Sequence, residues 1–307
     1  MRYPEPKINR MAEPPTATGA CRGEDKIVPR LPLPFPRRLL PALLLLLLLA
    51  GPAAAAGVTV TIGGTGSALG ALRQLTAGFE ADHPGLAVEI PSSLGTNGGI
   101  RAVGAGALDL SVSARPLTPA ETESGLRAVA WGRTPLMVVA SPRVPQTAID
   151  IAGLADILAG RHGQWDDGNP ITPVLRPPSD SDSLQLAAFS PQLAEALATA
   201  HAQPGMVVAV TDQDAARTIA GASGAIGTLT LLQVVSEGIR IQPLTLEGAR
   251  PDLATLAAGR YPLFREYWLV IGPHPSAGAR ALLDYLTGAA VAAKLPSLGM
   301  GPPVAGR

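Results

Sequence analysis

Two glycine-rich turns hold the residues of this sequence that are best suited to binding chemistry. GGTGSALG (residues 63–70) and LGTNGGI (residues 94–100) each follow a predicted strand and open a predicted helix. At such a turn the backbone N–H groups point outward, and the helix dipole favours an anion. Two turns at the carboxyl ends of neighbouring strands meet at one edge of the sheet. The spacing therefore predicts a shared anion site built from dipoles rather than from charged side chains.

The same glycines allow two other interpretations. Gly64, Gly66 and Gly70 resemble the glycine pattern of short-chain dehydrogenases, which bind a nicotinamide cofactor. After residue 57, however, the sequence contains a single lysine, Lys294, so the Tyr-x-x-x-Lys pair of those enzymes has no candidate. The glycines also suit tight turns that simply pack a helix against a strand. We therefore predict no cofactor, and the purely structural interpretation stays open for either turn alone.

Other catalytic or metal-binding patterns are weak. The four histidines are far apart in the chain and share no metal-ligand spacing. In GSALG (residues 66–70) the serine stands one place too early for the nucleophile elbow of a serine hydrolase. The acidic pair Asp166 and Asp167 is more typical of a turn than of a calcium or partner site. The sequence thus predicts no catalytic residue and no metal.

The elements that must position the glycine turns alternate between strands and helices. Residues 58–64 alternate as a strand does, and residues 69–79 repeat apolar side chains at helical spacing. Residues 126–141 supply two further predicted strands, and residues 224–235 supply another. Strands alternating with short helices predict a parallel or mixed α/β sheet. The lack of a Pro/Ser-rich linker fits lobes that are joined by continuous strands, as in a hinge-closing protein.

Composition and charge exclude several classes of protein. The 307 residues are 47% hydrophobic, which is enough for a core and for about two domains of ~150 residues each. Eight bases and four acids precede residue 58, so that part carries +4, and the remaining 16 bases and 20 acids carry −4. A nucleic-acid-binding protein needs a clustered cationic surface, which such a negative chain does not suggest.

Residues 1–57 have the pattern of a disordered leader that ends in a secretory signal peptide. Arg37-Arg38 precedes an apolar run of about 12 residues and a small-residue A-x-A site, so cleavage is expected between residues 54 and 57. A membrane anchor needs ~20 apolar residues, and prolines in and after the run weaken that alternative. The only cysteine, Cys21, would be removed with the leader. We therefore predict a thiol-free periplasmic protein, with the Sec and twin-arginine export routes both open.

Four ordered segments resemble the phosphate-binding proteins of bacterial ABC importers, which belong to the type II periplasmic binding protein class. The first segment spans residues 63–121 and includes both glycine turns. The others are SGAIGTLTL (223–231), AGRYPLFREYWLVIG (258–272) and LLDYLTGAAVAAKLPSLGM (282–300). The resemblance implies a two-lobed α/β fold with mixed sheets flanked by helices and a hinge between the lobes. One lobe would comprise residues 58–139 plus 233–307, and the other residues 140–232.

The resemblance also assigns ligand contacts. Ser67 stands where a hydroxyl and an amide of the family hold the anion, and Thr96 stands at the family's serine in the second turn. Arg176 stands where an arginine precedes a Ser-Gly-Thr anion turn, and its planar guanidinium suits a tetrahedral oxyanion. The predicted ligand-binding residues are Thr65, Gly66, Ser67, Ala68, Thr96, Asn97, Gly98, Arg176, Asp180 and Ser181.

Two departures from the family pattern bear on the ligand. Asp180, Ser181 and Asp182 replace the Ser-Gly-Thr turn, and Ala114 replaces a carboxylate that in some members accepts the proton of hydrogen phosphate. An ionised aspartate ~4 Å from a bound anion would cost about 4 kcal/mol at an effective dielectric constant of about 20. Either an aspartate accepts a ligand proton, or the aspartates point away and cap the following helix. In the first case the ligand carries a proton or an amino group.

The predicted function is that of a monomeric, extracytoplasmic protein that clasps a phosphate-like oxyanion for a membrane ABC permease. No chemistry is expected on the ligand, and Arg115 and Arg265 are expected to pair with acids. Three alternatives stay open: a binder of another oxyanion or small organic acid, a ligand sensor without a transport role, and a secreted enzyme that uses Asp180 and Asp182. No nucleic-acid partner is expected.

Overall fold

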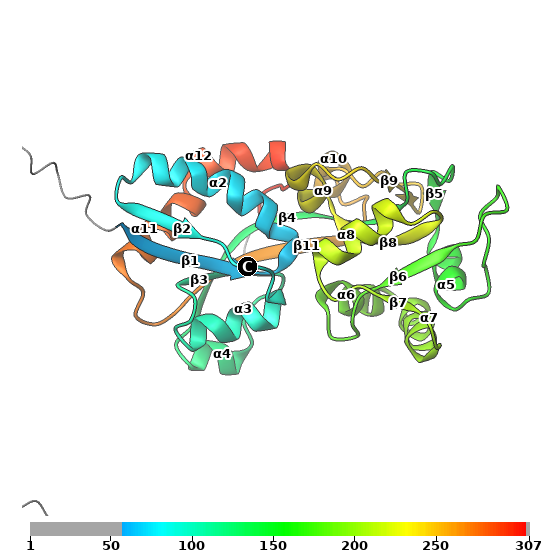
Figure 1. Ribbon diagram of the computed structural model, residues 1–307, viewed down its shortest axis with the longest axis horizontal. Coiled ribbons are helices and arrows are strands. Elements are labelled where there is room, and N and C mark those ends of the chain that lie inside the picture. The colour runs from blue at the N-terminus through cyan, green and yellow to red at the C-terminus, as the bar shows by residue number, and fades with distance from the viewer. Residues whose placement is uncertain (1–56, 305–307) are drawn as a thin grey trace, which may run out of the picture. The chain divides into compact units, whose positions relative to one another are not determined.

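The computed structural model describes residues 57–304, so the predicted leader lies outside the described residues except for Gly57. Strand β1 (Val58–Gly64) leads into the short 3₁₀ helix η1 (Gly66–Ala68) and then into α2 (Leu69–Asp82), as Figure 1 shows. Strand β2 (Leu86–Glu89) leads to α3 (Gly95–Gly104). Each glycine turn therefore joins a strand to a helix, as its sequence pattern predicts.

The remaining elements continue this alternation. From residue 110 to residue 230 they are β3 (Leu110–Ser113), α4 (Pro119–Glu123), β4 (Arg127–Ala140), β5 (Ala148–Ile149), α5 (Ile151–Leu158), β6 (Thr172–Leu175), α6 (Ser181–Phe189), α7 (Pro191–Ala202), β7 (Val207–Val208), α8 (Asp212–Gly221) and β8 (Ala225–Thr230). They are followed by α9 (Leu231–Glu237), β9 (Gln242–Pro243), β10 (Thr245–Leu246), α10 (Leu253–Ala257), β11 (Phe264–Ile271), α11 (Ala277–Thr287), α12 (Ala289–Lys294) and the 3₁₀ helix η2 (Leu295–Leu298).

Nine strands of the described residues form one mixed sheet. Their order is β2-β1-β3-β11-β4-β8-β6-β7, and β9 pairs with β4 beside this path. β1 is parallel to β2 and β3, and β6 is parallel to β7 and β8, whereas β4 is antiparallel to β8 and β11. Because β1 and β3 are parallel neighbours, the turn after β1 lies at the sheet edge where β3 also ends. The predicted mixed α/β sheet is confirmed.

Strand β4 is one strand of 14 residues where the sequence predicted two. Its first half pairs with β11 and its second half with β8, so the chain stays extended while it changes partners. A second difference lies at Thr230, where the strand predicted through residue 235 ends. The Thr230 side chain accepts a hydrogen bond from the amide of Gln233 at 3.2 Å and caps helix α9.

Two large clusters of buried side chains form most of the core. The first joins apolar residues of β1, α2 and β3 to others from β11 onward, and Phe79 and Tyr267 are its large members. The second joins residues from the second half of β4, α5, α6 and α7 to Tyr261 and its neighbours. Figure 1 shows α2 and α12 on one side of β1 and β3, and α3 and α4 on the other. The lobe boundaries expected from the sequence stay a prediction.

Candidate functional site

Gly64 shapes the first glycine turn. Its φ of +117° lies in the left-handed region, and a Cβ atom at this position would collide with the backbone of Val112 on β3. The amide of Thr65 then donates to the carbonyl oxygen of Val112 at 3.0 Å. Thr65 and Ser67 are buried as a result. The turn is thus held against the end of β3 by an approach that only glycine permits.

Tyr267 on β11 holds the hydroxyl group of Ser67. Its phenol donates to Ser67 Oγ at 2.8 Å and lies 3.3 Å from Thr230 Oγ1, while Thr65 Oγ1 lies 3.3 Å from Ser67 Oγ. Burial raises the pKa of the Tyr267 phenol, which therefore stays a neutral donor. Sequence reasoning missed Tyr267. Tyr267 could have been predicted from its position, two residues after Arg265 in the segment 258–272 that resembles the family.

Replacing Tyr267 with phenylalanine is expected to lower the free energy of unfolding by about 1–2 kcal/mol, because the hydroxyls of Ser67 and Thr230 lose a buried partner. Urea unfolding of the full chain measures the change. The matched control is Tyr285→Phe, whose phenol donates to Leu75 O at 3.2 Å from a half-buried position. If both substitutions lower the free energy of unfolding equally, the hydroxyl network around Ser67 contributes no more to stability than the single hydrogen bond of Tyr285.

Asp212, the first residue of α8, lies directly beside the first glycine turn. A Cβ atom at Gly66 would be 2.6 Å from Asp212 Oδ2, so only a glycine lets this carboxyl group come so close. The next residue, Gln213, donates from Nε2 to the carbonyl oxygen of Gly66 at 2.9 Å. Asp212 is not among the site residues predicted from the sequence. A signal was present, because Thr211 and Asp214 form a capping box that begins α8.

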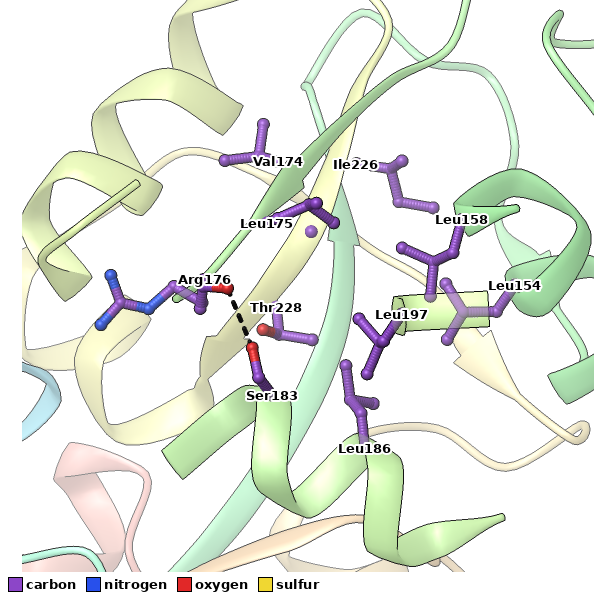
Figure 2. Close-up of a pocket in the computed structure, with 11 residues that line it drawn as sticks. Leu154, Leu158, Val174, Leu175, Arg176, Ser183, Leu186, Leu197, Ile226 and Thr228 are labelled. Atoms are coloured by element: carbon purple, nitrogen blue, oxygen red, sulfur yellow. Dashed lines mark hydrogen bonds between the residues drawn. The ribbon is translucent and has the colours of Figure 1, made fainter. Parts of the chain in front are cut away.

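Arg176 follows β6 and is almost fully buried. Its Nη1 donates to Ala209 O at 2.7 Å, and its Nη2 donates to Asp180 Oδ2 at 2.9 Å and lies 3.6 Å from Asp212 Oδ2. Within the described chain its Nε has no hydrogen-bond partner. Figure 2 shows the guanidinium pointing away from a small leucine-lined cavity of about 30 Å³, while the Arg176 carbonyl accepts a bond from Ser183.

Asp180 and Asp182 have different partners. Asp180 Oδ1 accepts the amide of Asp182 at 2.9 Å, so Asp180 both caps α6 and pairs with Arg176. Asp182 is buried, forms an ion pair with Arg265, and accepts the hydroxyl of Thr228 at 2.9 Å. The expected pairing of Arg265 with an acid is confirmed, and the contacts of Asp180 agree with the capping alternative.

This cluster contains more acid than base. Asp180, Asp182 and Asp212 face two guanidinium groups, those of Arg176 and Arg265. Burial raises the pKa of Asp212 to about 7, against the attraction of Arg176, and burial together with the nearby Asp182 charge also raises the pKa of Asp180. Asp212 is therefore the carboxyl group best placed to hold a proton near neutral pH.

A separate pocket of about 260 Å³ is lined by both the second glycine turn and the turn that begins α6; we call it the α3–α6 pocket. Its lining includes Thr96, Asn97, Gly98, Arg101, Asp180 and Ser181. Five of the predicted ligand-binding residues therefore share one pocket. The other five, Thr65 to Ala68 and Arg176, do not line it, and two of them, Gly66 and Arg176, lie beside Asp212.

Asn97 is oriented by Arg115. The Nε and Nη2 atoms of Arg115 donate to Asn97 Oδ1 at 3.2 and 2.8 Å, and both Nη atoms bond to the carboxylate of Glu121 at 2.8 Å. The hydrogen bond from Arg115 is the main reason that the pKa of Glu121 is lowered to about 2. The expected pairing of Arg115 with an acid is confirmed. With its oxygen engaged, Asn97 offers its NH₂ group to the pocket.

Two further observations concern the described residues 57–304 alone. They contain no group of three or more His, Cys, Asp or Glu side chains arranged to hold a metal ion. No helix among them is long and apolar enough to cross a membrane.

The fold, in which mixed sheets are flanked by helices, matches that of type II periplasmic binding proteins. The chain belongs to the PBP superfamily, since the model of the PBP superfamily domain matches residues 50–290. No curated protein matches the sequence.

Several solved structures share this fold. The chain is similar to a Clostridium perfringens protein described as a phosphate ABC transporter substrate-binding protein with bound phosphate, with a TM-score of 0.69, 16% identity, and coverage of 80% of this chain and 99% of that one. It is also similar to an ABC-type phosphate transport receptor from Vibrio cholerae (TM-score 0.58, 18% identity, 80% and 100% covered). A third is the CcmR regulatory domain of Synechocystis in complex with 2-PG (TM-score 0.51, 18% identity, 75% and 95% covered). At these identities the likeness establishes the fold and leaves the ligand open.

Proposed function

We propose that this protein is an extracytoplasmic solute-binding protein that clasps a small, phosphate-like oxyanion for delivery to an ABC permease. The observation that carries the proposal is the α3–α6 pocket, where two turns far apart in sequence present Thr96, Asn97 and Ser181 to one space. Relatives of the same fold are described as phosphate receptors of ABC transporters, and one as a periplasmic phosphate-binding protein, which supports the ligand class and the location.

The charges around the pocket favour an anion. The first turns of α3 and α6 direct backbone N–H groups and positive dipole ends toward it. Asp180 is the acidic residue among those that line the pocket, and both of its oxygens are engaged, one of them by Arg176. Its charge is thus largely balanced. Because the chain after residue 57 is net negative, binding must depend on these local donors.

Asp212 bears on the role proposed for Arg176. The resemblance implies that the anion lies between Arg176 and the turn at Gly66, where the structure has the carboxyl group of Asp212. We infer that the ligand binds in the α3–α6 pocket and that Arg176 acts on it indirectly, by orienting Asp180. Thr65, Gly66, Ser67 and Ala68 would then form the turn beside Asp212 rather than contact the ligand.

The proposed clasp has two lobes, residues 58–139 plus 233–307 and residues 140–232. The two turns that line the pocket come from different lobes under this division, so closing the lobes would expel water and strengthen each dipole contact. The PBP fold is typically that of a binding protein rather than an enzyme. The buried ion pair of Asp182 and the capping role of Asp180 give no support to a catalytic use of these acids.

A thermal-shift panel tests the proposal. Phosphate at one hundred times its Kd is expected to add about 2.7 kcal/mol of stability to the full chain. For a chain of this size that is a rise in Tm of about 5–10 °C. The panel compares phosphate with sulfate, carbonate and chloride at constant ionic strength, because screening alone changes surface electrostatics.

Asn97→Ala is expected to weaken about tenfold the binding of the anion that raises the Tm, since it removes one hydrogen-bond donor to a charged group. The matched control is Asn169→Ala, because Asn169 lies in an exposed turn and bonds to Asp167. If none of the oxyanions shifts the Tm, the proposed function is wrong. If Asn97→Ala and Asn169→Ala leave the same shift, the site is wrong.

A further inference from the structure

We propose that the oxyanion held in the α3–α6 pocket carries a short hydrocarbon chain, so that the ligand is an alkyl oxyanion such as an alkylphosphonate rather than inorganic phosphate. This inference rests on the proposed function, because it names the ligand class of the same pocket. Three features of the α3–α6 pocket support the inference: its apolar side chains, hydrogen-bond donors that have no partner, and an arginine that has no acidic partner among the described residues.

The apolar part of the pocket is formed by Leu94 and Val210. Leu94 directly precedes α3, and Val210 lies between β7 and α8, so they reach the pocket from distant segments. Their exposed fractions are 46% and 70%. A single exposed apolar side chain needs no explanation, but two in one small pocket present apolar surface that a ligand can cover. An inorganic anion has no group that would cover them, whereas a hydrocarbon chain does.

Helix α3 contributes polar side chains to the pocket. Arg101 lines the pocket, and its guanidinium has no hydrogen bond or ion pair to any other described residue. Asn97 lies one helical turn earlier, so the two side chains share a face of the helix. The NH₂ group of Asn97 is unused, since Arg115 engages only its oxygen. Together with the first-turn amides of α3, these groups can bind one anionic head group.

The charge and the volume of the α3–α6 pocket restrict the class of ligand that it can bind. Asp180 is paired with Arg176 rather than with Arg101, so the charge of Arg101 is available to a negative head group. The volume of about 260 Å³ is slightly below the ~300–1,000 Å³ of typical pockets for larger ligands. The pocket therefore suits a head group with a short chain and is small for a nucleotide.

Isothermal titration of the full chain at fixed pH and ionic strength tests the inference. The ligands are inorganic phosphate, methylphosphonate, ethylphosphonate and propylphosphonate, with butyrate as the carboxylate counterpart. Affinity is expected to rise about fourfold for each methylene that becomes buried against Leu94 and Val210. Tightest binding by butyrate would support an alkyl oxyanion and assign the head group as a carboxylate.

Substitutions of residues that line the pocket test whether the dependence of affinity on chain length arises there. Leu94→Ser and Val210→Ser are each expected to reduce the dependence of affinity on chain length, whereas Val235→Ser, at a 42% exposed site on α9, leaves it unchanged. Arg101→Gln is expected to lower the affinity for all of these anions at least tenfold. Arg73→Gln, at an exposed position on α2, is the charge-matched control.

The outcomes separate this inference from the proposed function. If phosphate binds and neither the phosphonates nor butyrate bind tighter than phosphate, the alkyl oxyanion is wrong while the oxyanion-binding function stands. If the tested oxyanions all fail to bind, both are wrong. A chain-length dependence that survives Leu94→Ser and Val210→Ser would also overturn the inference, because the chain would then lie elsewhere.

Discussion

Replacing Arg176 with alanine is expected to lower the free energy of unfolding by about 3–5 kcal/mol, the cost of leaving buried carboxylates without their cation. Arg176 is 5% exposed, and its guanidinium pairs with Asp180 and lies near Asp212. Asp180 would also lose the partner that orients it toward the α3–α6 pocket. Urea unfolding of the full chain measures the stability, and titration with the anion found in the thermal-shift panel measures the binding.

The control for this substitution is Arg217→Ala. Arg217 pairs with Asp214 on α8, but its side chain is 72% exposed, so water screens the pair. Exposed pairs contribute at most about 1 kcal/mol. If the two substitutions destabilise the protein equally, the cluster around Arg176 does not behave as a buried network. A rescue of Arg176→Ala at low pH, where the carboxyl groups become neutral, would support the assignment.

The second large effect is a dependence of stability on pH that comes from Asp212. Burial raises the pKa of Asp212 to about 7, well above the value of about 3.9 for an unfolded chain. Between these two values the folded state binds more protons than the unfolded state. Stability is therefore highest below about pH 4 as far as Asp212 is concerned, and it falls as the pH rises through about 7.

Asp212→Asn is expected to remove this dependence and to raise the stability at pH 8 by roughly 2 kcal/mol, because Arg176 and Arg265 then face only two carboxylates. Urea unfolding at pH 5, 6, 7 and 8 gives the slope for each chain, and the difference between the slopes removes the contribution of the histidines. The control is Asp214→Asn on the same helix. The pKa of Asp214 is lowered, mainly by the Thr211 hydroxyl. Asp214→Asn is therefore expected to leave the pH dependence of stability between about pH 4 and pH 7 unchanged. An equal slope in wild type and Asp212→Asn contradicts the prediction.

Local patterns in the sequence were sufficient for the elements and for the two glycine turns. Strand alternation, helical spacing and capping residues act over a few positions, and for this reason β1, α2 and α3 begin close to where the sequence predicts. The sequence could predict that Arg115 and Arg265 pair with acidic residues, because a buried or half-buried guanidinium group needs an acidic partner. Which acids they meet, Glu121 and Asp182, was not predictable.

The sequence by itself determined the fold class, the position of both turns and five residues of the pocket that the structure brings together. Only the tertiary structure placed Asp212 against Gly66 and Arg176, and Val210 in the same pocket as Leu94. The physical reason is the range of the interactions. Turn and helix signals are local, whereas the approach of α8 to η1 depends on how separate segments pack, and no spacing along the chain encodes that contact.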